Sequence, residues 1–211
     1  MKKTATFLGL TVACFAFCMA ASAQQAAKPK TAAKPAAPPT ISSELNTQLS
    51  IVEHEFVSAA EAMPEDKYNF APSDSMGNFK GVRTFAQEVK HVATANFAFF
   101  SAILGQAPPA GVSLEALNGP DDIQSKDQIV KYIKDSFALG HKAFATINAR
   151  NAATVIPKPP IPFFKTRLML ASFGCTHAFD HYGQMVEYLR MNGIVPPASQ
   201  GQPAANPSKS Q

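Results

Sequence analysis

The sequence predicts an all-α protein, an up-down four-helix bundle with long connections between its helices. In four segments, apolar residues recur every three or four positions, which is the period of an amphipathic helix. Residues that favour helix starts or stops flank these segments. No segment shows the strict alternation of apolar and polar residues that is typical of a half-buried strand.

The first two helices are expected at about residues 43–63 and 80–104. Ser43 is suited to cap the first, and Pro64 stops it because proline lacks a backbone donor. Gly105 can end the second in a left-handed conformation. The expected buried faces are Leu45, Leu49, Val52, Phe56, Ala59 and Met63 in the first, and Phe85, Val89, Val92, Asn96, Phe99 and Ile103 in the second.

The third helix is expected to begin at Ser125, which forms a capping-box pattern with Gln128. The fourth follows the proline-rich residues 157–162 and reaches about Asn192, where Gly193 ends it. Their expected buried faces are Ile129, Ile133, Phe137, Gly140 or His141, Phe144 and Ile147, and Leu168, Ala171, Cys175, Ala178, Tyr182, Met185 and Leu189.

The two ends of the chain differ from the bundle in composition. Residues 1–23 have a basic start, an apolar run and a small-residue cleavage pattern, so we expect a secretory signal peptide. An uncleaved membrane anchor is the alternative, because the apolar run is nearly long enough to span. Residues 24–41, rich in Ala, Lys and Pro, and residues 198–211 are expected to be a disordered linker and tail. The bundle domain is then 42–197, exported to the periplasm or secreted, with no stable membrane insertion after cleavage.

Charge and cysteine content exclude some functions. The pI of about 9.0 comes from the chain ends, because residues 42–196 hold 13 Lys and Arg against 15 Asp and Glu, a net charge of −2. No basic stripe with interleaved aromatic residues is present, so we expect no nucleic-acid partner. Removal of the signal leaves Cys175 as a lone cysteine, so no internal disulfide is expected.

Three histidines are candidate metal ligands. His177 and His181 stand four residues apart in the last helix, which places both imidazoles on one face, one turn apart. His91 lies in the second helix, and all three flank buried faces, where metal sites of helical bundles are built. Gly174, one turn before His177, is expected to leave room beside the pair. Three unrelated, hydrogen-bonded histidines are the alternative.

Five other polar or reactive residues are also candidates for a role, and each is weighed against a structural interpretation. His54 is expected to be exposed, and His141 to be a hydrogen-bonded core histidine rather than a fourth ligand or a group that orients one. We expect Cys175 to be a small buried residue rather than a ligand. Asp180 is expected in solvent, unless it orients a ligand. Glu88, one turn before His91, is expected to be a surface carboxylate, with a general base as the alternative.

His91, followed much later by His177-x3-His181-Tyr-Gly-Gln and by the closing run of residues 188–197, resembles the DinB-like family of four-helix bundles, as an exported member. The resemblance covers about residues 42–197. It implies a divalent metal ion held by His91, His177 and His181. Known activities of the family include metal-dependent transfer of low-molecular-weight thiols, and other members are named metal-dependent hydrolases. Family members often have a histidine where this chain has Asp180.

Two classes of function follow from these observations. The first is a metal-dependent hydrolase or transferase of the cell envelope that uses zinc or nickel and acts on an unidentified small molecule. An exported protein would lack the cytoplasmic thiol pool, which argues against a thiol transferase. The second is a non-catalytic bundle that binds a metal or small ligand and is related to envelope stress; a metal-free structural bundle is a further alternative. The sequence leaves homodimer formation open.

Overall fold

The computed structural model of the chain describes residues 38–201. Within that range it has four α-helices, α1 (Ile41–Ala62), α2 (Phe85–Leu104), α3 (Lys126–Ala145) and α4 (Arg167–Met191). Three short 3-10 helices accompany them, η1 (Glu65–Lys67), η2 (Asp74–Met76) and η3 (Pro197–Ser199). The predicted all-α four-helix bundle is therefore confirmed. The predicted signal peptide, most of the linker and the end of the tail lie outside the described residues.

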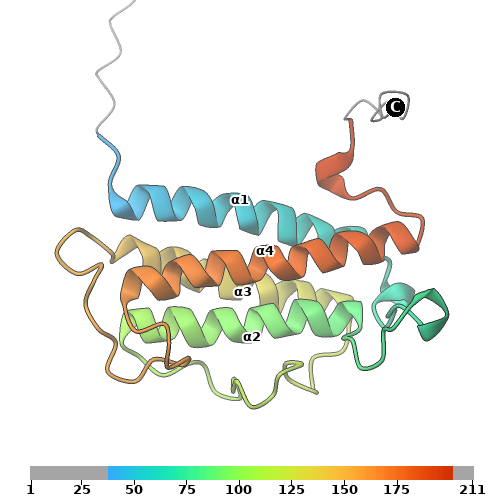
Figure 1. Cartoon of the computed structure of the whole chain (residues 1–211), viewed down its shortest axis with the longest axis horizontal. Coiled ribbons are helices and arrows are strands. Elements are labelled where there is room, and N and C mark those ends of the chain that lie inside the picture. The colour runs from blue at the N-terminus through green and yellow to red at the C-terminus, as the bar shows by residue number, and fades with distance from the viewer. Residues whose placement is uncertain (1–37, 202–211) are drawn as a thin grey trace, which may run out of the picture. The chain divides into compact units, whose positions relative to one another are not determined.

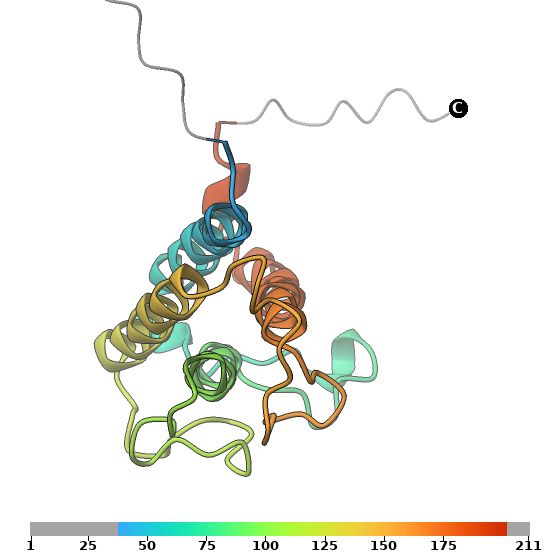
Figure 2. The same cartoon turned by 90° about the vertical axis from the view of Figure 1, so that its left-hand side faces the viewer.

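The four helices form a ring in which α1 and α2 occupy opposite corners. Each of these two packs against both α3 and α4, as Figure 2 shows. Contacts between α2 and α3 advance in the same direction along both helices: Thr94 pairs with Tyr132, Asn96 with Ser136, and Phe100 with Phe144. The helices α2 and α3 are therefore parallel, and in chain order the helices run up, down, down and up (Figure 1).

The parallel direction of α2 and α3 determines the path of their connection. Residues 105–125 return along the outside of α2 before α3 begins (Figure 1). The ammonium of Lys90 fastens this α2–α3 connection to the helix by donating to the carbonyls of Pro120, at 2.8 Å, and Ile123, at 3.2 Å. The connection therefore covers a face of α2 that includes His91.

Hydrogen-bonding caps set the starts of the helices. Thr40 caps α1 by accepting from the Ser43 backbone at 3.1 Å, so α1 begins before Ser43, which was predicted as its cap. Thr84 caps α2, and the predicted start near Lys80 was therefore too early. The capping box predicted at Ser125 is confirmed. No helix within residues 38–201 has the length and hydrophobicity needed to cross a bilayer.

The predicted buried faces form one core, with two exceptions in α4. Leu168 is 40% exposed, and Tyr182 is half-buried. Leu170 and Tyr188 are buried instead. The buried face of α4 is wider than a single stripe because α4 packs against both α1 and α2.

Two helical glycines make room for the ring of Phe100. A Cβ atom at Gly140 would lie 2.7 Å from one ring carbon of Phe100, and a Cβ atom at Gly174 would lie 2.9 Å from another. The space expected beside the histidines at Gly174 is therefore occupied by Phe100. Close packing in the centre of the bundle depends on the two glycines.

Replacing Gly140 by alanine is expected to lower the free energy of unfolding by about 1–3 kcal/mol, because the new methyl group would overpack the core. Urea unfolding followed by circular dichroism measures the change. Gly183→Ala is the matched control, since a Cβ at that helical glycine meets nothing within 4 Å. The control is expected to stabilise the helix by about 0.5–1 kcal/mol. Equal effects of the two substitutions would contradict the packing role of Gly140.

Candidate metal centre

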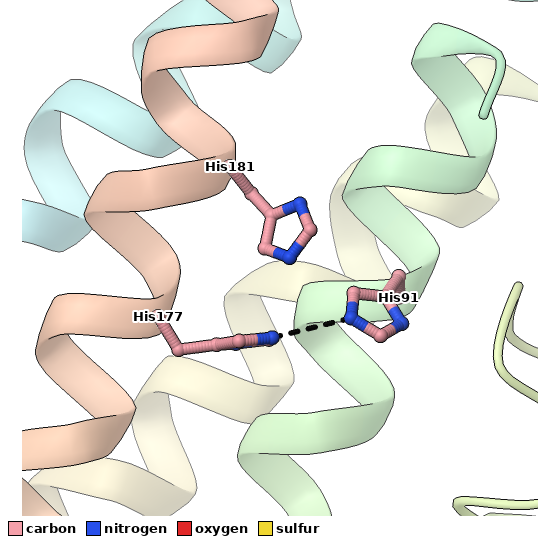
Figure 3. A group of neighbouring side chains, drawn as sticks. All are labelled: His91, His177 and His181. Atoms are coloured by element: carbon pink, nitrogen blue, oxygen red, sulfur yellow. Dashed lines mark hydrogen bonds between the residues drawn. The ribbon is translucent and has the colours of Figure 1, made fainter. Parts of the chain in front are cut away.

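The antiparallel neighbours α2 and α4 bring His91, His177 and His181 together (Figure 3). One ring nitrogen of each lies within 4.8 Å of the others. The Nε2 atoms of His91 and His177 are 3.2 Å apart. That separation is close to the ~3.3 Å expected when two nitrogens bind one ion at about 2.05 Å with tetrahedral angles.

The imidazole of His91 is oriented by a backbone carbonyl. Its Nδ1 atom lies 2.5 Å from the carbonyl oxygen of Leu117 in the α2–α3 connection. Since a carbonyl can only accept, Nδ1 carries the proton and donates it. The Nε2 atom of neutral His91 therefore presents its lone pair to the other two histidines.

The imidazole of His181 is oriented by a buried carboxylate. Its Nδ1 atom lies 2.5 Å from Oε2 of Glu88, and Glu88 is 1% exposed. The expectation of a surface carboxylate at Glu88 was therefore wrong. The residue lies on the face of α2 that packs against α4, one turn before His91. Asp180, for which the sequence left open a role in orienting a ligand, is exposed and accepts from Gln184 at 3.4 Å.

The imidazole of His177 is held mainly by packing. Its ring contacts those of Phe99 and Phe173, with centroids 5.9 and 5.6 Å away. Its Nδ1 atom is buried and has no hydrogen-bond partner within residues 38–201. Burial, with smaller contributions from His181 and His91, lowers the pKa of His177 to about 3. Its ring is therefore neutral near pH 7, as a metal ligand must be.

The positive charge of Arg83 acts on two of the three histidines. Burial is the main cause that lowers the pKa of His91, and the guanidinium of Arg83 lowers it further. Arg83 also contributes to the lowered pKa of His177. The Nε atom of Arg83 donates to the Asn118 side chain at 3.0 Å, which ties Arg83 to the α2–α3 connection next to Leu117.

These observations fit a divalent ion of the zinc or nickel type. Imidazole nitrogen suits both metals, and three protein ligands leave positions open for water or a substrate. Ligand histidines of metal sites usually donate their second nitrogen to a carbonyl or carboxylate, as His91 and His181 do here. The donor set is therefore suited to a catalytic rather than a closed structural metal site.

The remaining sequence candidates lie away from this centre. His54 is exposed, as predicted. His141 is hydrogen-bonded, as predicted, but it is half-buried and not in the core: its nitrogens lie 2.8 Å from Asn46 and 2.9 Å from Glu53, both on α1. Cys175 is fully buried, and burial raises the pKa of its thiol to about 12, so it stays protonated.

Sequence reasoning named Glu88 as a surface carboxylate or general base but missed its role as the acceptor that orients His181, and it missed Arg83 and the carbonyl of Leu117 altogether. The spacing of Glu88 and His91 is a signal for the role of Glu88, because residues three apart share a helix face. For Leu117 there is no such signal, since any residue supplies a carbonyl.

Replacing Gly119 by alanine is expected to weaken metal binding by about tenfold, because it would displace the carbonyl that orients His91. Gly119 has φ 76°, and a Cβ there would lie 2.5 Å from Cβ of Lys90. Gly111→Ala is the matched control in the same connection, since Gly111 has φ 80° and open space around it. Competition with a chelating dye measures the affinity. Equal losses in the two variants would argue against a role for the position of Leu117.

Comparison with known proteins identifies the family of the chain. The family model of the DinB superfamily matches residues 48–185, which is more than half of the chain and contains all three histidines. A search of curated proteins found no match. Together with the four-helix fold, the match shows that the chain belongs to the DinB superfamily.

Proposed function

We propose that this protein binds one zinc or nickel ion through the Nε2 atoms of His91, His177 and His181 and uses it as a hydrolase or transferase of the cell envelope. The observation that carries the proposal is the orientation of two rings. Leu117 and Glu88 hold the Nδ1 protons of His91 and His181, so that the Nε2 lone pairs converge beside His177.

The residues around the histidines have separate tasks in this proposal. Glu88 accepts a hydrogen bond from Nδ1–H of His181. Its negative charge makes Nε2 of that ring a stronger electron-pair donor to a metal ion. Phe99 and Phe173 fix the His177 ring and keep water from one side of it. Arg83 provides positive charge to attract an anionic oxygen of a substrate. A bound ion would supply Lewis-acid chemistry toward water or a carbonyl or phosphoryl oxygen.

The proposed location rests on the sequence of residues 1–23, which lie outside the described structure. An exported enzyme would work without the cytoplasmic pool of reduced thiol cofactor. Export therefore favours hydrolysis, or transfer of a group other than a thiol.

The direct test is the metal content of the chain from Gln24 onward, purified without a histidine tag and measured by elemental mass spectrometry. We expect about one divalent ion per chain. The metal-loaded protein is then screened against esters, amides and phosphate esters. A protein that stays metal-free after reconstitution with zinc, nickel and manganese would contradict the proposal.

A second candidate function is binding of a metal or small ligand without turnover. The observation that favours it concerns Glu88, the carboxylate hydrogen-bonded to His181. Since Glu88 is engaged by His181 and buried, it is not free to act as a general base. Metal-loaded protein that binds small ligands at the ion but turns over none of the screened substrates would support this second function.

A further inference from the structure

A hollow lies along the same face of α2 as the candidate metal centre. Ala98 and Ala102, which line it, follow His91 by seven and eleven residues, or about two and three helical turns. Its volume is about 650 Å³. Pockets that enclose small organic ligands span ~300–1,000 Å³, so the hollow has the size of a ligand site.

Three separate segments wall this pocket, which we call the alanine pocket. The helix α2 contributes Ala98 and Ala102, and the α2–α3 connection contributes Val112 and Leu114. The third wall, Ile156 and Pro157, belongs to the α3–α4 loop (residues 146–166). Figure 2 shows that both connections lie on the α2 side of the bundle. Small or apolar side chains thus face an open volume instead of one another.

Hydrogen bonds within the chain hold both loop walls in place. The Ile156 backbone donates to the Lys165 carbonyl at 2.7 Å, and Val155 pairs with Thr166 in a short antiparallel bridge. The α2–α3 connection is fastened to α2 by Lys90 and His91. The walls therefore need no ligand to form, which is typical of small-molecule sites.

Two opposite charges stand at the edge of the pocket. Glu115 comes from the α2–α3 connection and Lys158 from the α3–α4 loop, and both are exposed. Within residues 38–201, neither forms an ion pair at 4.0 Å or less with another side chain. Since the two charges offset each other, the edge favours neither a cation nor an anion, but suits a polar group that both donates and accepts hydrogen bonds.

We propose that the alanine pocket binds a small organic molecule with an apolar body and an uncharged or dipolar polar end. The apolar body lies against Ala98, Ala102 and Pro157, and the polar end lies between Glu115 and Lys158. The three histidines do not line the pocket, so this binding site does not depend on the proposed metal.

The test measures binding of 1-octanol, octanoate and octylammonium to the full chain by isothermal titration calorimetry and protein NMR. These probes share one apolar body and differ in the end group. We expect saturable binding of 1-octanol at one site. Ala102→Leu fills the pocket and is expected to weaken that binding by about tenfold or more. Ala145→Leu, at an exposed position of α3, is the matched control and is expected to leave it unchanged.

The edge charges give a second, independent readout. Lys158→Ala is expected to weaken the binding of octanoate and strengthen the binding of octylammonium, each by about two- to fivefold. Glu115→Ala is expected to have the opposite effect on each probe. The proposal is overturned if 1-octanol does not bind saturably at millimolar concentrations. It is also overturned if Ala102→Leu, folded by circular dichroism, binds as the unmodified protein does, or if either charged probe binds more than about tenfold tighter than 1-octanol.

Discussion

His177→Ala is expected to remove the divalent ion, lowering the content from about one ion per chain to near zero. The substitution leaves two nitrogens, from His91 and His181, which cannot hold the ion through dialysis as three can. It also removes the ligand whose Nε2 atom lies 3.2 Å from that of His91. Elemental mass spectrometry of untagged protein, after dialysis against a weak chelator, measures the loss.

The control for this experiment is His141→Ala. His141 is a half-buried, hydrogen-bonded histidine like the candidate ligands, but its partners are Asn46 and Glu53 on α1. The control is expected to keep its metal. Circular dichroism establishes that both variants are folded. Full metal content in His177→Ala would show that the three histidines are not the binding site.

Glu88→Ala is expected to have the second largest effect, lowering metal affinity by about 10- to 100-fold. Without the carboxylate, the ring of His181 loses the acceptor that fixes its Nδ1 proton. The same change leaves a buried donor without a partner, which costs about 1–3 kcal/mol of folding stability. Competition with a chelating dye reports the affinity, and urea unfolding of the metal-free protein reports the stability.

Two further variants separate charge from hydrogen bonding at this position. Glu88→Gln keeps an oxygen acceptor of the same size, so we expect it to lose less affinity than Glu88→Ala. Glu187→Ala removes an exposed carboxylate from α4 and is expected to change neither quantity. Unchanged affinity in Glu88→Ala would limit the role of this residue to packing between α2 and α4.

The sequence predicted the features that depend on local patterns. Apolar periodicity placed the four helices, and cap residues such as Ser125 and Gly193 placed some of their ends. The spacing of His177 and His181 identified one side of the candidate centre. These features depend only on residues within a few turns of one another.

The features that the sequence did not predict depend on contacts between distant segments. The burial of Glu88 follows from which face of α2 meets α4, and apolar spacing left that residue at the margin of its stripe. The parallel direction of α2 and α3 could not be predicted, because the connection between them is long enough to permit either direction. The carbonyl of Leu117 reaches His91 only because the connection returns along α2.

The separation of the histidines along the chain has a consequence for folding. His91 and His177 are 86 positions apart, so their nitrogens meet only after α4 has docked on α2. A partly folded chain therefore has no three-histidine site, and an ion that binds only the native state adds its binding energy to native stability. At a free metal concentration of 100 times Kd, this addition is about 2.7 kcal/mol. Metal supply in the compartment where the protein folds would thus set how long the native chain survives proteolysis.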